Sequence, residues 1–183
     1  MPRIQPVDAE NPSADAAPML EGLKAKLGRV PNIYGTMANA PAVLKFALEG
    51  SGTLGETSLP ADVREQIALA VGGANRCGYC AAAHTAIGKM AGLSDDATQA
   101  ALNGSADDAK VQAALDFARA ILAREGFVTD EQFAAVKAAG YGDQQVLEII
   151  AVTVFNIFTN YLNHITDPEI DFPEVDLPAG AGV

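Results

Sequence analysis

The segment CGYCAAAH, at positions 77–84, holds both cysteines of the chain and one of its two histidines. On a helix, Cys77, Cys80 and His84 fall at positions i, i+3 and i+7 and share one face. Cys80 and His84 are i, i+4 neighbours, close enough for the imidazole to accept a thiol proton. Cys77 falls at the helix start, where free N–H groups and the helix dipole favour a thiolate. The segment therefore supplies a nucleophile, a base and a second thiol that can close a disulfide.

A histidine that acts as a base gains from a carboxylate that orients it, and Glu65 is the candidate. If helices at 59–74 and 77–91 form an antiparallel hairpin that turns near Asn75, His84 lies nine residues after the turn and Glu65 ten before it. With a rise of about 1.5 Å per residue, the two side chains are nearly level. Glu65 also has small and apolar helix neighbours, among which a carboxylate should be paired or functional. The alternative is a structural salt bridge with the adjacent arginine or another cation.

The same thiols could instead bind a metal. Cys77, Cys80, His84 and His164 would form a Cys2His2 set, and the spacing of the two cysteines suits zinc. A lone CxxC pair in a chain without other cysteines is more typical of a redox pair, and the helix dipole explains a histidine near a helix end, such as His164. We therefore expect no metal and no other cofactor.

Composition narrows the class of protein. The chain has 183 residues, enough for one domain with a buried core, and a net charge of −11. Such an acidic chain lacks the basic patch that nucleic acid or an anionic membrane surface demands. The N-terminal residues contain no apolar signal segment, and no uncharged apolar run approaches the roughly 20 residues of a membrane span. We expect a cytoplasmic protein, in which a CxxC pair is rarely a structural disulfide.

The elements that position these residues are all expected to be helices. Besides 59–74 and 77–91, the pattern predicts helices over 18–27, after Pro31, after Pro41, between Ser94 and Gly104, and over about 107–124, 130–139 and 144–165. The expected N-caps are Ser58, Ser94, Thr129 and Asp143. No segment alternates with the period of a strand. The sequence predicts an all-α, single-domain helical bundle over residues 17–167, with an extended arm at 1–16 and an extended tail at 168–183.

The last of these helices carries an unusual polar stripe. Thr153, Asn156, Asn160 and Asn163 recur at helical spacing in an otherwise apolar segment. Buried amides must find hydrogen-bond partners, so the stripe should face a polar cavity or a neighbouring subunit. The alternative is that it faces water.

These residues resemble a known family. Glu65, eleven intervening residues and then C-x-x-C-x-x-x-H match the signature of the alkylhydroperoxidase D-like / carboxymuconolactone decarboxylase superfamily at every fixed position. GRVPNIYGTMANAPAVL (28–44) and VFNIFTNYLNHITDPEIDFP (154–173) resemble its peroxidase-related branch. The resemblance covers roughly residues 17–173.

The resemblance implies a helical protein of the alkylhydroperoxidase D-like type that assembles as trimers or hexamers and reduces hydroperoxides with thiols. By position, Cys80 is the peroxidatic thiol that becomes a sulfenic acid, and Cys77 is the more exposed thiol that closes the disulfide. Glu65 and His84 form the proton relay. A lipoyl-type or similar dithiol protein would re-reduce the disulfide. The helix dipole alone favours Cys77 as the nucleophile, but Cys77 is about 10.5 Å of helix rise from His84, so we expect Cys80 to attack.

One position departs from the family pattern. The best-known alkylhydroperoxidase D proteins have a second histidine just before the second cysteine, where this chain has Tyr79. A phenol with a pKa of about 10 is a poor base at neutral pH but a good hydrogen-bond donor, so Tyr79 is expected to support the site. Two alternatives remain open. One is a decarboxylase that leaves the thiols idle, and the other is a zinc- or disulfide-switched interaction protein.

Overall fold

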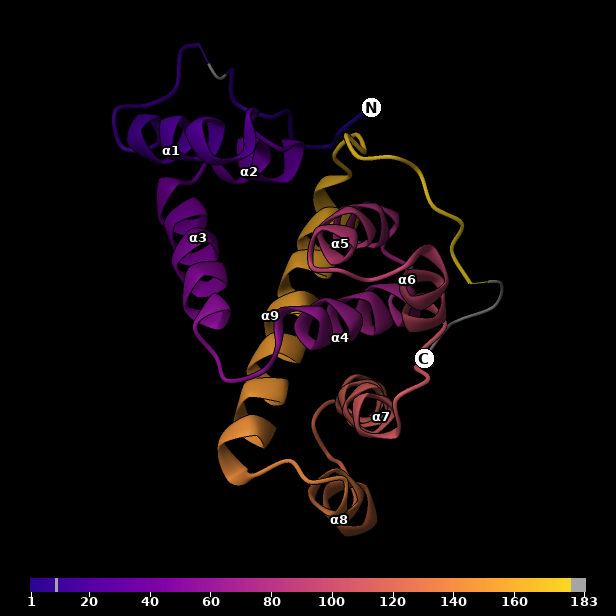
Figure 1. Ribbon diagram of the computed structural model, residues 1–183. Coiled ribbons are helices and arrows are strands. Elements are labelled where there is room, and N and C mark those ends of the chain that lie inside the picture. The colour runs from indigo at the N-terminus through magenta and orange to yellow at the C-terminus, as the bar shows by residue number, and fades with distance from the viewer. Residues whose placement is uncertain (9, 179–183) are drawn as a thin grey trace.

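The computed structural model describes residues 1–8 and 10–178, and its regular structure consists of nine helices (Figure 1). They are α1 (Ala17–Leu27), α2 (Asn32–Met37), α3 (Pro41–Gly55), α4 (Ala61–Ala74), α5 (Gly78–Met90), α6 (Asp95–Leu102), α7 (Ala109–Ala123), α8 (Asp130–Ala138) and α9 (Asp143–Thr166). These described residues contain no strand. The predicted all-α fold is confirmed.

Two predicted side-chain caps are confirmed, and two are wrong. Ser94 caps α6, and Thr129 caps α8 in a reciprocal capping box. Helix α4 begins without a side-chain cap, because Ser58 lies too far upstream and instead donates its N–H and hydroxyl to Glu148, at 3.0 and 2.7 Å. Asp143 lies inside the first turn of α9 and does not cap it.

Helix α4 is the central element, because it packs against α5, α6, α7 and α9. Its residues from Gln66 to Gly73 are all buried. Gly73 allows α6 to approach closely, since a Cβ atom there would lie 2.0 Å from the carbonyl oxygen of Leu102. The side chains of Ile67, Leu115 and Ile149 bring α4, α7 and α9 into one hydrophobic core. This packing fixes the hairpin of α4 and α5 against α9.

A second hydrophobic cluster joins α1–α3 to the start of α5 and to the chain ends. Leu44, Cys77 and Cys80 are buried in it, and Phe172 of the C-terminal tail packs against it. The N-terminal arm is attached at the end of α9, where Arg3 N–H donates to Thr166 O at 2.8 Å. In Figure 1 the tail leaves α9 and returns past α5 and α6. The predicted tail residues 179–183 lie outside the described residues.

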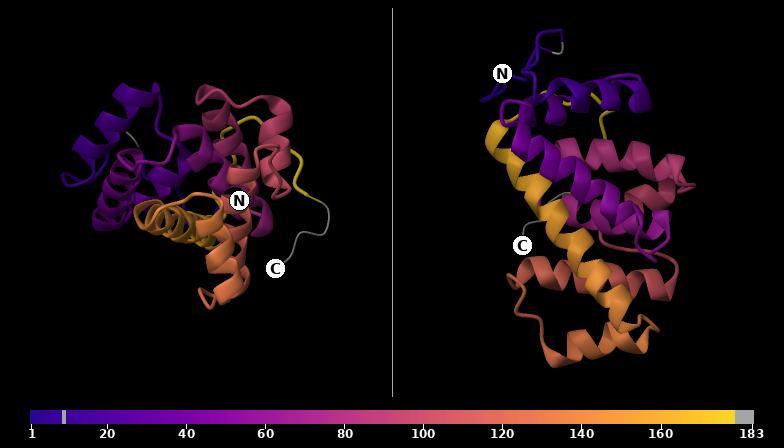
Figure 2. Two further views of the ribbon diagram at one scale, coloured as in Figure 1. Left: turned by 60° about the horizontal axis from the view of Figure 1, so that its bottom comes forward. Right: turned by 90° about the vertical axis from the view of Figure 1, so that its left-hand side faces the viewer.

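Helix α9 crosses most of the molecule and runs beside α3 (Figure 2). By length and composition alone this helix would suffice to cross a membrane, although no uncharged apolar run of that length was expected from the sequence. However, its buried side chains include three asparagines that face protein, and it packs against α3, α4, α5, α7 and α8. A core helix of a helical bundle meets the same criteria of length and composition.

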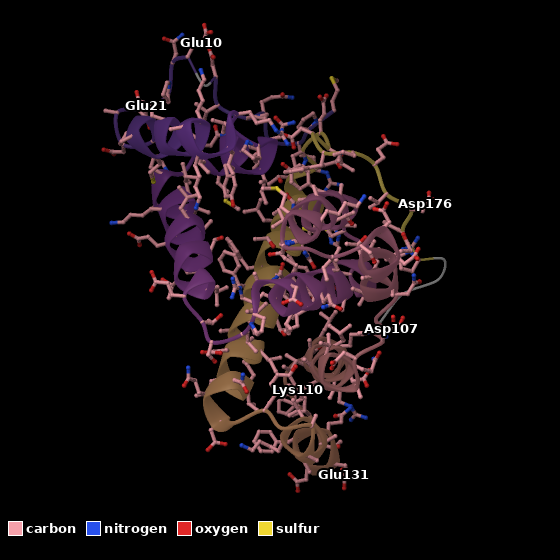
Figure 3. The ribbon with its side chains drawn as sticks, in the orientation of Figure 1. Glu10, Glu21, Asp107, Lys110, Glu131 and Asp176 are labelled. Atoms are coloured by element: carbon pink, nitrogen blue, oxygen red, sulfur yellow. The ribbon has the colours of Figure 1, made fainter. Side chains whose placement is uncertain are left out.

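Charged side chains lie around the periphery of the molecule. Figure 3 labels six of them, on the N-terminal arm, α1, the segment before α7, α7, α8 and the tail. These six charged side chains come from separate elements and do not gather in one place.

Candidate active site

The turn between α4 and α5 places both cysteines. Arg76 adopts a left-handed conformation (φ 56°), which reverses the chain after α4, and Cys77 N–H donates to Gly72 O at 2.9 Å. Cys77 is the N-cap of α5, and its Sγ accepts from Cys80 N–H at 3.4 Å. Cys80 lies in the first turn of α5, so both sulfurs are at the N-terminus of the helix, as the sequence predicts.

The two thiols form a close, buried pair. They are free cysteines whose Sγ atoms lie 2.7 Å apart. Cys77 is 1% exposed and Cys80 is 3% exposed, so the expected greater exposure of Cys77 is not present in the isolated chain. A small movement would bring the sulfurs to the disulfide distance of about 2.05 Å.

Charge is distributed unequally between these sulfurs. We assign the shared proton to Cys80, because Cys77 Sγ accepts a backbone N–H at the helix N-terminus. The hydrogen bond from Cys80 lowers the pKa of Cys77 despite burial, while the same bond, with burial, raises the pKa of Cys80. Titration of such a pair belongs to both groups. Its first ionisation therefore leaves negative charge mainly on Cys77.

Glu65 and His84 meet as the hairpin geometry predicts. His84 Nδ1 lies 2.7 Å from Glu65 Oε2, and the two side chains are 22% and 18% exposed. Burial by itself would lower the pKa of His84, but the Glu65 carboxylate and the Cys77 sulfur outweigh it and raise that pKa. Glu65 therefore favours the protonated form of the imidazole beside the thiol pair.

The polar stripe of α9 faces the thiols and the histidine, and does not face water or a neighbouring subunit. We call Thr153, Asn156, Asn160 and Asn163 the polar face of α9; all four are buried. Asn163 Nδ2 lies 3.1 Å from Cys80 Sγ and 3.9 Å from Cys77 Sγ. Asn160 lies beside Cys80 and Asn156 beside His84, close enough to shift their pKa values. The stripe therefore lies inside the protomer, not against a neighbouring subunit.

Tyr79 is held by a cluster that sequence reasoning missed. Its hydroxyl donates to Asp171 Oδ1 at 2.7 Å and accepts from Ile33 N–H at 3.2 Å. Asp171 also pairs with Arg29. Burial and Asp171 raise the pKa of Tyr79 far above its ordinary value, so the phenol stays protonated and cannot act as a base. Instead Tyr79 links the CxxC turn to the C-terminal tail. In the sequence, only the family resemblance over residues 28–44 and 154–173 pointed to the segments that contain Arg29 and Asp171.

A shallow cleft of about 400 Å³ leads to this site. Its lining residues come from the CxxC turn, the end of α9 and the tail, namely Arg76, Cys77, Gly78, Tyr79, Asn163, His164, Asp167, Pro168 and Ile170. Cys77 lines this cleft, and Cys80 does not. Within the described residues, no three His, Cys, Asp or Glu side chains come together to hold a metal, so the Cys2His2 set that includes His164 is not assembled.

Known proteins share this architecture. Residues 41–124 match the carboxymuconolactone decarboxylase family. Similar solved structures include a peroxidase-related protein with an alkylhydroperoxidase AhpD core from Ralstonia eutropha JMP134 (24% identity, 93% of this chain and 92% of the other, TM-score 0.85). A peroxidase-related protein from Silicibacter sp. TM1040 gives 25% identity, 91% coverage of both chains and a TM-score of 0.81.

A third solved structure is a cysteine-to-alanine variant of the debrominase Bmp8 in complex with 2,3,4-tribromopyrrole, with 22% identity, 92% and 91% coverage and a TM-score of 0.79. At that identity the likeness shows the fold alone. No curated protein sequence matches the chain. The family match over residues 41–124, the helical fold shared with peroxidase-related proteins and the spacing of Glu65, the CxxC pair and His84 support the resemblance to the alkylhydroperoxidase D-like / carboxymuconolactone decarboxylase superfamily.

Proposed function

We propose that the protein is a thiol-dependent hydroperoxide reductase that cycles its CxxC pair between dithiol and disulfide. The observation that carries this proposal is the close pair of free thiols, 2.7 Å apart, beside an ion-paired His84 and Glu65. The peroxidase-related proteins of the same fold support it. A decarboxylase would leave this buried pair of thiols without a task.

The proposed reaction has two steps. A thiolate attacks the terminal oxygen of the hydroperoxide, an S–O bond forms as the O–O bond breaks, and the departing alkoxide takes a proton from the His84 imidazolium. The second thiol then attacks the sulfenic sulfur, an S–S bond forms, and the hydroxide leaves as water with the proton of that thiol. Two electrons pass from the sulfurs to the peroxide. Glu65 stabilises the charged imidazole before the first step.

The geometry favours Cys77 as the attacking sulfur, in place of the Cys80 expected from the sequence. The pKa of Cys77 is lowered and Cys77 lines the cleft, whereas the pKa of Cys80 is raised and Cys80 does not line it. A thiolate is far more nucleophilic than a thiol. Cys80, already adjacent, is then the resolving thiol.

Renewed turnover requires a reductant that the chain does not contain. A dithiol that reaches the cleft would attack the disulfide and leave as a disulfide itself, and its two electrons would restore both thiols. Because the disulfide would lie in a cleft lined by Gly78 and Ile170, a slender arm such as a protein-bound lipoyl group fits better than a flat protein surface.

We also propose that the chain forms a homo-oligomer of three or six copies. The outer face of α9, which we define as Leu147, Val154, Tyr161 and Ile165, is 50–67% exposed, and Phe46 of α3 is 57% exposed. Stable monomers rarely expose so many large apolar side chains on one face. The sequence analysis considered a neighbouring subunit as a possible partner of the polar stripe. The polar face of α9 is instead buried inside the protomer and has no part in this interface.

The test is a peroxide-consumption assay with cumene hydroperoxide and dihydrolipoamide. The wild-type protein should consume both in equal amounts, and Cys77→Ser and Cys80→Ser should not turn over. If the wild-type protein leaves the peroxide untouched while its thiols are reduced, the proposal is wrong. Stoichiometric zinc in the purified protein would instead favour the interaction protein considered above.

A further inference from the structure

The polar face of α9 contains two buried amide atoms that the fold leaves without partners. Asn160 Nδ2 and Asn163 Oδ1 make no hydrogen bond to any described residue, although Asn160 is 0% and Asn163 is 4% exposed. Buried polar groups are otherwise almost always paired, and an unpaired one calls for a functional explanation. Both atoms belong to side chains that lie beside the sulfurs.

The orientation of Asn160 is fixed from outside the thiol site. Asn75 Nδ2 donates to Asn160 Oδ1 at 2.8 Å, so the NH2 group of Asn160 must point elsewhere. Asn75 is the C-cap residue that follows α4, two positions before Cys77. The NH2 group of Asn160 is buried without a partner among the described residues, and the side chain of Asn160 lies near enough to Cys80 to lower the pKa of that thiol. Asn75 is thus suited to position this donor.

Asn163 contacts the reacting atoms directly. Its Nδ2 lies within hydrogen-bond distance of both sulfurs, at 3.1 Å from Cys80 and 3.9 Å from Cys77. One amide therefore serves the charge whichever sulfur holds it. N–H donors to an ionised acceptor form stronger bonds than donors to a neutral one, and a buried site strengthens them further.

We propose that Asn160 and Asn163 form an amide pair that donates N–H groups to the negative charge of the Cys77–Cys80 pair, with Asn75 as a positioning residue. Asn163 is then a catalytic residue, and this role rests on the proposed function. The polar face of α9 thereby complements the helix dipole of α5: two elements far apart in sequence stabilise one charge from two sides.

Other titratable or charged groups also surround the sulfurs, and the test must separate their effects from that of the amides. They are His84 and Tyr79 on α5, Glu65 on α4 behind His84, and Arg76, His164 and Asp167 around the cleft. All of these groups are still present in variants with a substitution at Asn160 or Asn163.

The test is a pH titration of thiolate absorbance near 240 nm on the reduced full-length protein. Asn163→Leu should move the titration upward by about one pH unit, which leaves about tenfold less thiolate at a given pH below the midpoint. Asn160→Leu should move it in the same direction, and Asn75→Ala by a smaller amount. Thr153→Val is the matched control, because its hydroxyl bonds only to Ile149 O, at 2.7 Å. It should titrate like the wild type.

The proposal is overturned if Asn163→Leu and Asn160→Leu titrate like the wild type, or if Thr153→Val shifts as far as they do. Circular dichroism checks folding. Should a leucine variant not fold, Asn163→Ala decides, because it removes the same N–H donor without adding a charge, and an unchanged titration would defeat the proposal. The titration uses no peroxide. A wild-type protein that never reacts with peroxide therefore defeats the proposed function, whereas unshifted variants defeat only the amide pair.

Discussion

The two faces of α9 reverse the usual arrangement of a surface helix, because the buried face is polar and the exposed face is apolar. The polar face, with Asn156, Asn160 and Asn163, is buried, while the outer face exposes Val154, Tyr161 and Ile165. At 3.6 residues per turn the two sets lie on opposite sides of the helix. Amphipathic helices of soluble monomers place apolar residues inside and polar residues outside.

This inversion assigns a different task to each face. Burying amides is unfavourable unless they find partners, and here Asn163 contacts the sulfurs while Asn156 lies beside the His84 imidazole. Exposing aromatic and branched side chains is unfavourable unless something covers them. The inner face therefore contacts the active site that we propose, and the outer face is the surface that we propose for assembly.

The largest effect should come from the thiols that the inner face contacts. Cys77→Ser and Cys80→Ser should each lower dithiol-dependent turnover by at least about a hundredfold, because neither variant can close the disulfide. After one addition of peroxide, Cys80→Ser should hold a sulfenic acid on Cys77 that dimedone labels and mass spectrometry locates. A label on Cys80 in Cys77→Ser, with none on Cys77 in Cys80→Ser, would return the attack to Cys80.

A charge introduced on the outer face of α9 should lower the mass of the assembly. Val154→Glu places a carboxylate in the centre of that face and should dissociate the oligomer to a protomer of 18.9 kDa, measured by light scattering coupled to gel filtration. Phe127→Glu is the matched control, since Phe127 is 82% exposed but lies in the segment between α7 and α8, away from the outer face. A wild-type protein that is monomeric at micromolar concentration contradicts the proposed assembly.

Removing the charge behind the imidazole should have an intermediate effect. Because Glu65 raises the pKa of His84, Glu65→Gln should lower that pKa, weaken the thiolate and slow alkylation by iodoacetamide several-fold near pH 7. Glu49→Gln, which changes an exposed carboxylate on α3, is the control and should leave the rate unchanged. An unchanged rate in Glu65→Gln would make Glu65 a structural carboxylate only.

The same pair predicts how stability depends on pH. A histidine whose pKa is higher in the folded than in the unfolded protein stabilises the fold fully below its unfolded pKa of about 6.5. That contribution is lost as the pH rises through the folded pKa. The difference in unfolding free energy between wild type and Glu65→Gln should therefore be larger at pH 6 than at pH 9, measured by denaturant titration. A difference that grows with pH would contradict the ion pair.

The smallest effect is expected at Tyr79. Tyr79→Phe removes the hydroxyl that joins Asp171 to Ile33 N–H and should lower the free energy of unfolding by about 1 kcal/mol, with little change in thiol titration. Tyr161→Phe, which removes an exposed hydroxyl, should change stability less. If Tyr79→Phe instead moves the thiol titration as far as Asn163→Leu, then Tyr79 acts on the sulfurs and not through the tail.

The sequence predicted the helices and much of the site because local rules govern them. Spacing placed Cys77, Cys80 and His84 on one helix, and the length of the hairpin placed Glu65 level with His84. Local patterns could not show what α9 packs against, so the position of Asn163 on the sulfurs depended on the tertiary fold. Asp171 was missed for the same reason, since Tyr79 and Asp171 are 92 residues apart. The choice between sulfurs depended on a hydrogen bond that no spacing specifies.

The most direct test of the central claim is a single turnover without reductant. Reduced wild-type protein is mixed with an equal amount of cumene hydroperoxide, and free thiols and intact mass are followed over time. We predict that both thiols per chain are lost together, that the mass falls by two hydrogen atoms, and that one cumyl alcohol forms per chain as a Cys77–Cys80 disulfide appears. Thiols that stay reduced while the peroxide persists would contradict the account.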